Sequence, residues 1–364
     1  MEPWFGPEEK QAVAEYLDSN AWLTEFKKTE EFEARIAHYV GSKYCVATVN
    51  GTIALTMAVM ASGIGPGDEV LVPDYTMIAT ANSVRLAGAT PVFVDIDPAT
   101  SCMDIQNADR AITPRTKALM LVSINGRSPD MDAFAELCQK RNVLLLEDAA
   151  QSLGSRYKGK HLGSFGFAGC FSFSVPKVIT TGQGGAVVTD DAKVFEKLRL
   201  VKDFGRERAG VDVHIAMGYN FKFTDLQAVI GIEQMKKLPW RVERKKEMYR
   251  LYQRLLADIR EVVFPQTDLG DTSPWFVDIL VPRERREALM GHLKDKGVGS
   301  RPFYPPIHSQ KPYASSEGAF SHSVDISRRG LWLPSSSFLN DEDIHYVSSH
   351  IREFFSESPL KLST

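Results

Sequence analysis

The chain has 364 residues, of which 43% are hydrophobic and 24% charged, and its formal net charge is −3. This composition is typical of a soluble globular protein with one large or two medium domains. It argues against a nucleic-acid-binding protein, because the sequence contains no dense block of Lys and Arg.

The first two thirds of the chain alternate between helical and extended apolar patterns. In chain order, these patterns predict helices at 7–20 and 30–40, a strand at 44–49, a helix at 53–61, a strand at 69–72, a helix at 77–87, strands at 91–95 and 118–122, a helix at 131–140 and a strand at 143–146. Such alternation indicates an α/β fold, with a mainly parallel sheet flanked by helices on both faces.

The pattern changes after residue 189. It is helical to residue 203, irregular over 205–218, and helical again over 224–259 with an interruption at Pro239. A long helix kinked at a proline commonly bridges two domains. We therefore expect a large domain over 1–238, which includes the N-terminal helices, and a smaller α+β domain over 239–364. In the second, the patterns predict a strand at 275–281 and helices at 284–296 and 341–355.

The cysteines and the lengths of the apolar runs indicate the cellular compartment in which the protein is expected. Cys45, Cys102, Cys138 and Cys170 are scattered without metal-binding spacing, so we expect free buried thiols and no metal site. No apolar run approaches the ~18 residues of a membrane span. The N-terminal residues lack the basic and apolar regions of a signal peptide, so we expect a cytoplasmic protein without membrane contact.

The stretch over 143–189 carries the clearest chemistry. A short apolar run ends at Asp148, and a second predominantly apolar segment contains Lys177. Parallel sheets place their sites at the carboxyl ends of strands. We hypothesise that both side chains face one cofactor, with the carboxylate pairing a protonated ring nitrogen and the amine forming a Schiff base. The alternative is a turn cap and a solvated lysine, which the apolar surroundings disfavour.

A possible anion site lies earlier in the chain. Asn50-Gly51-Thr52 stands between a predicted strand and a predicted helix. Free backbone N–H groups at a helix N-terminus bind phosphate. A plain helix cap explains the tripeptide equally well when it is taken alone.

Three other local patterns have little support. Gly154 to Lys160 resembles a phosphate-binding P-loop but is followed by His161 in place of Ser or Thr, and it reads as a polar hairpin. Ser174 and Lys177 match the Ser-x-x-Lys of penicillin-recognising enzymes without their other motifs. The chain also lacks the Gly-x-Gly-x-x-Gly of a nicotinamide-binding site.

Taken together, the motifs resemble those of the DegT/DnrJ/EryC1/StrS family of pyridoxal-phosphate-dependent nucleotide-sugar aminotransferases. The resemblance covers nearly the whole chain and implies fold type I, the fold of aspartate aminotransferase. It looks closest to perosamine-synthase-like members, which aminate C4 of a nucleotide-linked 4-keto-6-deoxy sugar. The motifs are Asn50-Gly51-Thr52, Glu147-Asp148-Ala149-Ala150-Gln151, Phe171-Ser172-Phe173 with Lys177, Thr180-Thr181-Gly182-Gln183-Gly184-Gly185, Gly218-Tyr219-Asn220, and Arg301-Pro302-Phe303-Tyr304 through His308.

The resemblance implies a role for each matched residue. Lys177 would be the Schiff-base lysine and general base, and Asp148 the partner of the pyridine nitrogen. The further contacts that it implies are Gln151 near the cofactor's phenolic oxygen, Gly51, Thr52 and Ser172 at its phosphate, Asn220 reaching that phosphate from the neighbouring subunit, and Lys222, Tyr304 and His308 on the substrate side. The family works as homodimers with shared active sites, and we expect the same here.

Some positions depart from the family's usual residues. Met77 stands where many members place an aromatic ring over the cofactor, and a thioether covers a ring without aromatic stacking. Ser123 and Asn125 replace frequent His and Tyr, and Lys222 replaces a frequent Arg. The last change exchanges a bidentate anion clamp for a point charge. These differences bear on the substrate more than on the reaction.

The expected activity is the transfer of the amino group of L-glutamate to a nucleotide-linked 4-keto-6-deoxyhexose. The product would be a 4-amino-4,6-dideoxy sugar for surface polysaccharide or glycan biosynthesis. Alternatives within the family are a sugar 3-aminotransferase and a dehydratase, although the dehydratases replace the lysine at the position of Lys177. A sensor or regulator that keeps the fold without turnover is the alternative from another class.

Overall fold

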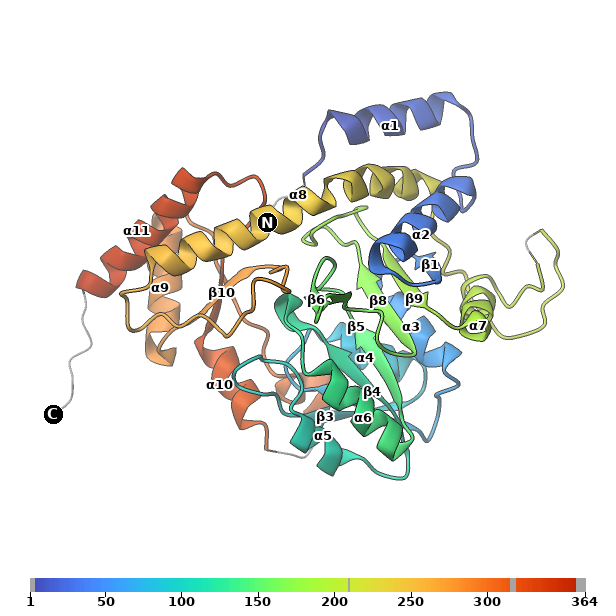
Figure 1. The fold of residues 1–364 in the computed structure, drawn as a ribbon, viewed down its shortest axis with the longest axis horizontal. Helices are drawn as coiled ribbons and strands as arrows, with labels where there is room; N and C mark the ends of the chain where they lie inside the picture. Colours follow the sequence, from blue (N-terminus) through green and yellow to red (C-terminus); the bar gives the residue numbers. More distant parts are fainter. Residues whose placement is uncertain (1–3, 209, 315–318, 358–364) are drawn as a thin grey trace.

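A computed structural model describes residues 4–208, 210–314 and 319–357. Two N-terminal helices precede the main sheet, and a long helix follows it (Figure 1). The helices up to that point are α1 (Pro7–Asp18), α2 (Lys27–Val40), α3 (Gly51–Ala61), α4 (Ala79–Leu86), α5 (Ile105–Ala111), α6 (Met131–Arg141), α7 (Ala192–Lys202) and α8 (Asp225–Leu255). None of the helices within the described ranges is long and apolar enough to cross a membrane.

The main sheet has seven strands in the order β1-β9-β8-β5-β4-β2-β3. Its strands are β1 (Tyr44–Thr48), β2 (Glu69–Pro73), β3 (Thr90–Val94), β4 (Thr116–Val122), β5 (Leu144–Asp148), β8 (Ala168–Ser172) and β9 (Gly185–Thr189). The pairs from β8 to β3 are parallel, whereas β9 is antiparallel to both of its neighbours. The predicted α/β fold with a mainly parallel sheet is therefore confirmed.

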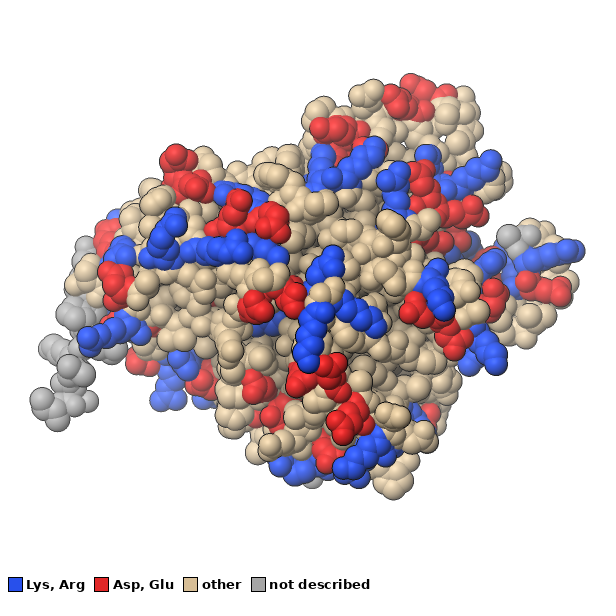
Figure 2. Space-filling view, in the orientation of Figure 1, with Lys and Arg blue, Asp and Glu red and all other residues tan. Residues whose placement is uncertain are grey.

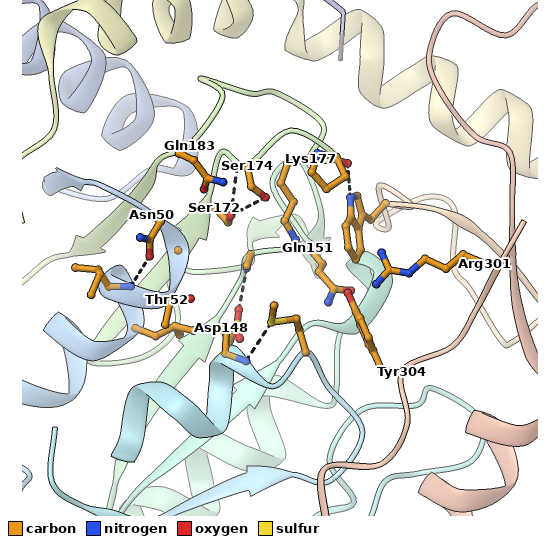
Figure 3. A pocket seen from close by; sticks show the side chains of 18 residues that line it. Asn50, Thr52, Asp148, Gln151, Ser172, Ser174, Lys177, Gln183, Arg301 and Tyr304 are labelled. Carbon is orange, nitrogen blue, oxygen red and sulfur yellow. Dashed lines mark hydrogen bonds between the residues drawn. The ribbon is translucent and has the colours of Figure 1, made fainter. Parts of the chain in front are cut away.

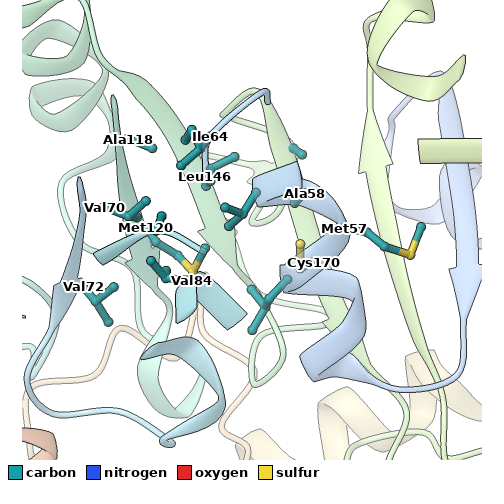
Figure 4. Close-up of a cluster of buried hydrophobic side chains, with 14 of the residues drawn as sticks. Met57, Ala58, Ile64, Val70, Val72, Val84, Ala118, Met120, Leu146 and Cys170 are labelled. Atoms are coloured by element: carbon teal, nitrogen blue, oxygen red, sulfur yellow. The ribbon is translucent and has the colours of Figure 1, made fainter. Parts of the chain in front are cut away.

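Side chains of successive strand residues enter different cores, as the two-residue period of a strand requires. Val70 and Val72 of β2 pack with α3 and α4 on one face (Figure 4), whereas Leu71 packs with α6 on the other. The second face is completed by α2 and α8, which cover β1, β8 and β9. Burial on both faces explains why these strands read as continuous apolar runs.

Between β5 and β8, the chain forms the short antiparallel hairpin of β6 (Arg156–Tyr157) and β7 (Lys160–His161). The polar hairpin predicted for this segment is thus confirmed. The four cysteines are free and buried, as expected.

The C-terminal part has its own antiparallel sheet, in the order β10-β12-β11. Its elements are β10 (Val277–Leu280), α9 (Arg283–Asp295), β11 (Arg301–Pro302), α10 (Ser321–Arg329), β12 (Gly330–Leu333) and α11 (Asp341–Glu357). A separate apolar core joins this sheet to α9, α11 and the second half of α8. The sequence patterns did not predict α5, α10, β11 or β12, which are short or lack a regular apolar period.

The interruption of the long helix predicted at Pro239 is wrong, because α8 continues through this residue to Leu255 (Figure 1). Proline in a helix interior costs about 3 kcal/mol. Leu238 and Val242 are buried in the core on either side of it, and their packing offsets that cost. The division that we predict after residue 238 would fall inside this helix, and it stays a prediction.

Charged side chains are mixed over the surface. On the face seen in Figure 2, acidic and basic residues lie interspersed, without a large area of one sign. Inside the protein, by contrast, Arg127 forms an ion pair with Asp278 of β10 at 2.7 Å, with side chains that are 3% and 1% exposed. The Arg127 Nε atom also donates to the carbonyl of Thr100, and Tyr249 donates to Asp278. This network links the large sheet's loops to the C-terminal sheet.

We expect Arg127→Ala to lower the free energy of unfolding by about 3–5 kcal/mol, because it leaves the Asp278 carboxylate buried without its cation. Urea denaturation of both proteins measures the difference. Lys236→Ala is the matched control, because it breaks an exposed pair with Glu233 and should cost about 0–1 kcal/mol. Equal losses for the two variants would contradict a structural role for the buried pair.

Candidate active site

The site lies where β5 and β8 end and α3 begins. A cavity of about 640 Å³ opens there. It is lined by Asn50, Gly51, Thr52, Ile53, Leu55, Met77, Ala79, Asp148, Ala150, Gln151, Ser172, Ser174, Pro176, Lys177, Gln183, Trp275, Arg301 and Tyr304 (Figure 3). Ends of parallel strands and a helix N-terminus therefore meet around one open cavity, the usual arrangement in open α/β sheets.

Most of the residues singled out from the sequence meet in this cavity. Those that line it are Gly51, Thr52, Met77, Asp148, Gln151, Ser172, Lys177 and Tyr304. Three others, Asn220, Lys222 and His308, do not line it in the single chain.

Asp148 stands at the end of β5 and is 5% exposed. Its Oδ2 accepts a hydrogen bond from Thr80 Oγ1 at 2.7 Å, and its Oδ1 accepts one from the Ala150 N–H at 3.1 Å. Burial raises the pKa of this carboxyl group, and these hydrogen bonds and the nearby Lys177 oppose that shift. A cation placed against Asp148 would hold it ionised, so the geometry suits a protonated ring nitrogen.

Lys177 lies in the loop between β8 and β9, and its Nζ is 3.8 Å from the centroid of the Trp275 ring. Trp275 also donates from Nε1 to the Pro176 carbonyl at 2.6 Å, which fixes the backbone next to the lysine. Desolvation lowers the pKa of Lys177 to about 8, and the Asp148 charge opposes this shift. The amine is therefore set up to lose its proton near neutral pH.

The start of α3 forms the anion end of the cavity. Asn50 caps the helix by accepting from the Ile53 N–H at 2.9 Å. A Cβ atom at Gly51 would lie 2.7 Å from the Ser172 Cβ, and one at Gly185 would lie 2.5 Å from the Asn50 carbonyl oxygen. Only glycine allows these close approaches, which bring the Ser172 side chain next to the helix N-terminus. The helix cap and the anion site predicted for this tripeptide are thus compatible.

Gln151 and Met77 both line the cavity but differ in exposure. Gln151 is buried, and its Oε1 accepts from the Asn125 N–H at 2.7 Å. Asn125 in turn is fixed by two hydrogen bonds to the backbone of Phe276 and has a φ of 53°. Met77 is 44% exposed, and its sulfur accepts from the Ala79 N–H. Gln151 is therefore rigidly held, whereas Met77 presents an uncovered thioether to the cavity.

The three residues outside the cavity have partners elsewhere. Lys222 forms an ion pair with Asp203 at 2.9 Å. The His308 Nδ1 atom lies 2.7 Å from Oδ2 of the buried Asp74. The backbone of Asn220 pairs with that of Asp203. Within one chain, Lys222 and His308 are thus engaged by carboxylates, and none of the three residues lines the cavity that contains Lys177.

Among the lining residues that received no role from the sequence, those with polar, charged or aromatic side chains in the lysine loop and the C-terminal part are Ser174, Gln183, Trp275 and Arg301. Ser174 and Gln183 lie within a few residues of Lys177, on either side of it in the sequence. This position could have indicated that they line the site. Trp275 and Arg301 come from the C-terminal part. From the sequence alone, an ordinary core tryptophan or surface arginine at these positions could not be distinguished from a residue of the site.

Comparisons with known proteins agree with this geometry. The DegT/DnrJ/EryC1/StrS aminotransferase family matches residues 4–352. GDP-perosamine synthase of Escherichia coli O157:H7 is 36% identical over 357 residues, covering 98% of each chain. The spore coat polysaccharide biosynthesis protein SpsC of Bacillus subtilis is 34% identical, covering 96% of this chain and 95% of that protein. The structure of S. venezuelae DesV in complex with a ketimine intermediate matches with a TM-score of 0.90 at 34% identity, covering 95% of this chain and 94% of that one.

The chain therefore belongs to the DegT/DnrJ/EryC1/StrS aminotransferase family, and the resemblance drawn from its motifs is confirmed. It is an enzyme of the aminotransferase class.

The lowered pKa of the half-buried Lys177 predicts a pH-dependent stability for the cofactor-free protein. Its pKa falls from 10.5 to about 8 on folding, so the unfolded chain binds more protons between these values and stability rises with pH across that window. Lys177→Met keeps the apolar stem and removes the buried charge. The cofactor-free variant should be more stable than the cofactor-free wild type at pH 7, by about 1–3 kcal/mol.

Urea denaturation at pH 7 and pH 10 measures this gap, which should shrink at the higher pH. Lys236→Met serves as an exposed control without such a gap. Equal stability of wild type and Lys177→Met at pH 7 would show that the Lys177 charge is well solvated.

Proposed function

We propose that the protein is a pyridoxal-phosphate-dependent aminotransferase that moves the amino group of L-glutamate to a nucleotide-linked 4-keto-6-deoxyhexose. The observation that carries the proposal is the meeting of the buried Asp148 and the half-buried Lys177 with the N-terminus of α3 in one cavity. Support for C4 amination comes from relatives named GDP-perosamine synthase and from the dTDP-4-dehydro-2,3,6-trideoxy-D-glucose 4-aminotransferase of Saccharopolyspora spinosa, which is 31% identical.

The donor groups in the cavity fit this cofactor. Gly51, Thr52 and Ser172 would hold its phosphate, since backbone N–H groups and a hydroxyl converge where glycine leaves room. Asp148 would hold the ring nitrogen protonated, and Gln151 would contact the phenolic oxygen. When bound, pyridoxal phosphate supplies an electron sink for the electron pair released at the carbon that carries the amine. Met77 would lie against the cofactor ring.

Lys177 would transfer the proton in both halves of the reaction. Its lowered pKa lets Nζ accept a proton from the amine-bearing carbon of the donor and return a proton to the acceptor carbon. The indole of Trp275, 3.8 Å from Nζ, limits the positions that the amine can take. We propose that Lys222, Tyr304 and His308 contact the substrate in the assembled enzyme, where Lys222 and His308 would have to serve a site other than the cavity of their own chain.

The proposal is tested by the visible absorbance of the purified protein. L-Glutamate should abolish the band of the cofactor bound through Lys177, and addition of a GDP-, UDP- or dTDP-linked 4-keto-6-deoxy sugar should restore it. Lys177→Ala should lower turnover by more than about 10³-fold, because it removes both nucleophile and base. A wild-type protein without such a band, or one whose band glutamate leaves unchanged, would refute the proposal. Recovery of deoxygenated sugar would indicate the dehydratase instead.

We also propose a homodimer in which Asn220 reaches the cofactor phosphate of the partner subunit. The loop after α7 projects from the body of the chain (Figure 1) and exposes Val213, Ile215 and Met217 by 50%, 61% and 80%. Such apolar exposure on a projecting loop suits burial against a second copy. Asn220 follows this loop and is not among the residues that line the cavity of its own chain.

Subunit mixing tests the shared site. Lys177→Ala and Asn220→Asp should each be inactive, the second because its carboxylate repels the phosphate. After unfolding and refolding together in equal amounts, half of the dimers would be mixed, and each would carry one intact site. About one quarter of wild-type activity should return. If no activity returns in the mixture, the proposal of a shared site is wrong. The same holds if the wild-type protein stays active as a monomer on dilution.

A further inference from the structure

A cluster of two imidazoles and one carboxylate lies between α9 and α11, in the C-terminal part of the chain (Figure 1). Its members are His292 of α9 and His350 and Glu353 of α11, and one possible ligand atom of each lies within 4.8 Å of the other two. Imidazole nitrogens and carboxylate oxygens are ligands that transition-metal ions take in proteins. Our expectation of no metal site rested on the cysteines, and none of them belongs to this cluster.

The backbone around the cluster is fixed by the C-terminal core. Leu293 of α9 and Val347 of α11 are both buried in that core, next in sequence or nearly so to the cluster. His350 and Glu353 are three residues apart, so they project from the same face of α11. His292 meets them from the other helix. Ligands carried by two packed helices are held in place more firmly than ligands carried by loops.

His292 provides the observation that points to a ligand. Its side chain is 19% exposed, but its Nε2 atom is buried and has no hydrogen-bond partner among the described residues. Oε2 of Glu353 lies 3.9 Å from this nitrogen, which is too far for a hydrogen bond. Buried polar atoms are normally paired. An ion held between Nε2 and Oε2 would supply the partner that the nitrogen lacks.

The Glu353 carboxylate presents one oxygen to the two histidines. Its Oε1 accepts from Nζ of Lys296 at 2.8 Å, whereas its Oε2 lies 2.6 Å from Nδ1 of His350. Hydrogen bonds with Lys296 and His350 lower the pKa of Glu353 to about 2, so the carboxylate is ionised at neutral pH. Lys296 thus orients the carboxylate from its outer side, as hydrogen-bond partners of metal ligands commonly do.

The distances within the cluster are close to those of a zinc site. With zinc–ligand bonds of about 2.0–2.2 Å in a tetrahedron, ligand atoms lie about 3.4 Å apart. The separations of 2.6 Å and 3.9 Å fall on either side of this value, so small rotations bring the three atoms onto one ion. Aromatic neighbours limit larger rotations, since the ring of His292 lies 5.6 Å from that of Phe354 and the ring of His350 lies 4.5 Å from that of Tyr346.

We infer that His292, His350 and Glu353 bind a divalent transition-metal ion of the zinc type, which joins α9 to α11. Two imidazoles favour such an ion over Mg²⁺ and Ca²⁺, which prefer oxygen ligands throughout. The Glu353 side chain is 33% exposed, so a water molecule can reach the ion as its fourth ligand. Neither helix contributes a residue to the cavity that contains Lys177. The ion would therefore stabilise the C-terminal part, and the inference does not rest on the proposed function.

Titration with Zn²⁺ tests the inference on the full-length protein, freed of metal with EDTA and then of EDTA. Calorimetry should show one tightly bound Zn²⁺ per chain, and His292→Gln, His350→Gln and Glu353→Gln should each weaken its binding at least tenfold. His345→Gln is the matched control, because it removes an exposed histidine from the same helix, and it should bind Zn²⁺ as the wild type does. Co²⁺ should give the ligand-field absorption of a tetrahedral ion in the wild type and the control but not in His292→Gln.

Thermal unfolding gives a second readout. Zn²⁺ at 100 times its Kd should raise the ratio of folded to unfolded protein about 100-fold. The Tm of the wild type and of His345→Gln should rise accordingly, and that of the three ligand variants should not. Glu353→Gln keeps the test valid where a change at His292 disturbs the packing against Phe354.

The absence of saturable Zn²⁺ binding would overturn the inference. Binding that none of the ligand variants weakens, or a Co²⁺ spectrum of an octahedral ion, would show an adventitious surface ion and would overturn it as well. Glu353→Gln should leave the response of the visible absorbance to L-glutamate unchanged. Failure of the metal site and failure of the proposed function are therefore distinguishable.

Discussion

The end of β5 carries two adjacent buried carboxylates, and the need to satisfy them organises the centre of the molecule. Glu147 is 1% exposed and accepts three backbone hydrogen bonds, from Gly163, Phe165 and Gly166. Burial raises its pKa and these N–H groups lower it, so the loop before β8 is tied to β5. Because side chains alternate along a strand, Asp148 points to the other side. One strand end thus fixes the local backbone with one carboxylate and presents the other to the active site.

In the free site, the surroundings of the acid Asp148 and of the base Lys177 shift their pKa values in opposite directions. Burial raises the pKa of Asp148 and lowers that of Lys177, so each group is biased towards its neutral form. The proposed cofactor would reverse the first effect, because its ring nitrogen would bring a positive charge to the carboxylate. The cofactor would benefit from the lowered pKa of Lys177, because a neutral amine is the nucleophile that forms the Schiff base. The cost of desolvating the Asp148 carboxylate and the Lys177 amine is therefore best understood as preparation for a ligand.

Local sequence patterns predicted much of the large sheet and of the cofactor end of the cavity. The strand at 143–146 and the glycine turn at Gly51 follow rules of period and backbone freedom, which act within a few residues. Patterns failed where packing between distant segments decides the outcome. The helix continues through Pro239 because Leu238 and Val242 are buried on either side. Trp275 meets Lys177 only after the C-terminal part has folded against the sheet, and nothing in its neighbouring residues indicates this contact.

The same distinction applies to the substrate end of the site. His308 is fixed by Asp74 from a distant segment, with its backbone N–H donating to Oδ1 at 2.9 Å and its ring stacked on Phe320. The motif that contains it therefore sets a position relative to the end of β2, and not a direct contact with Lys177. Arg301, at the start of the same motif, does reach the cavity, because β11 pairs with β12 and so places it against Trp332. Cofactor residues are carried by the rigid ends of the large sheet, whereas residues that would choose the substrate are carried by the smaller sheet and its loops. Variation of the second set can change the substrate without disturbing the buried carboxylates on which the chemistry depends.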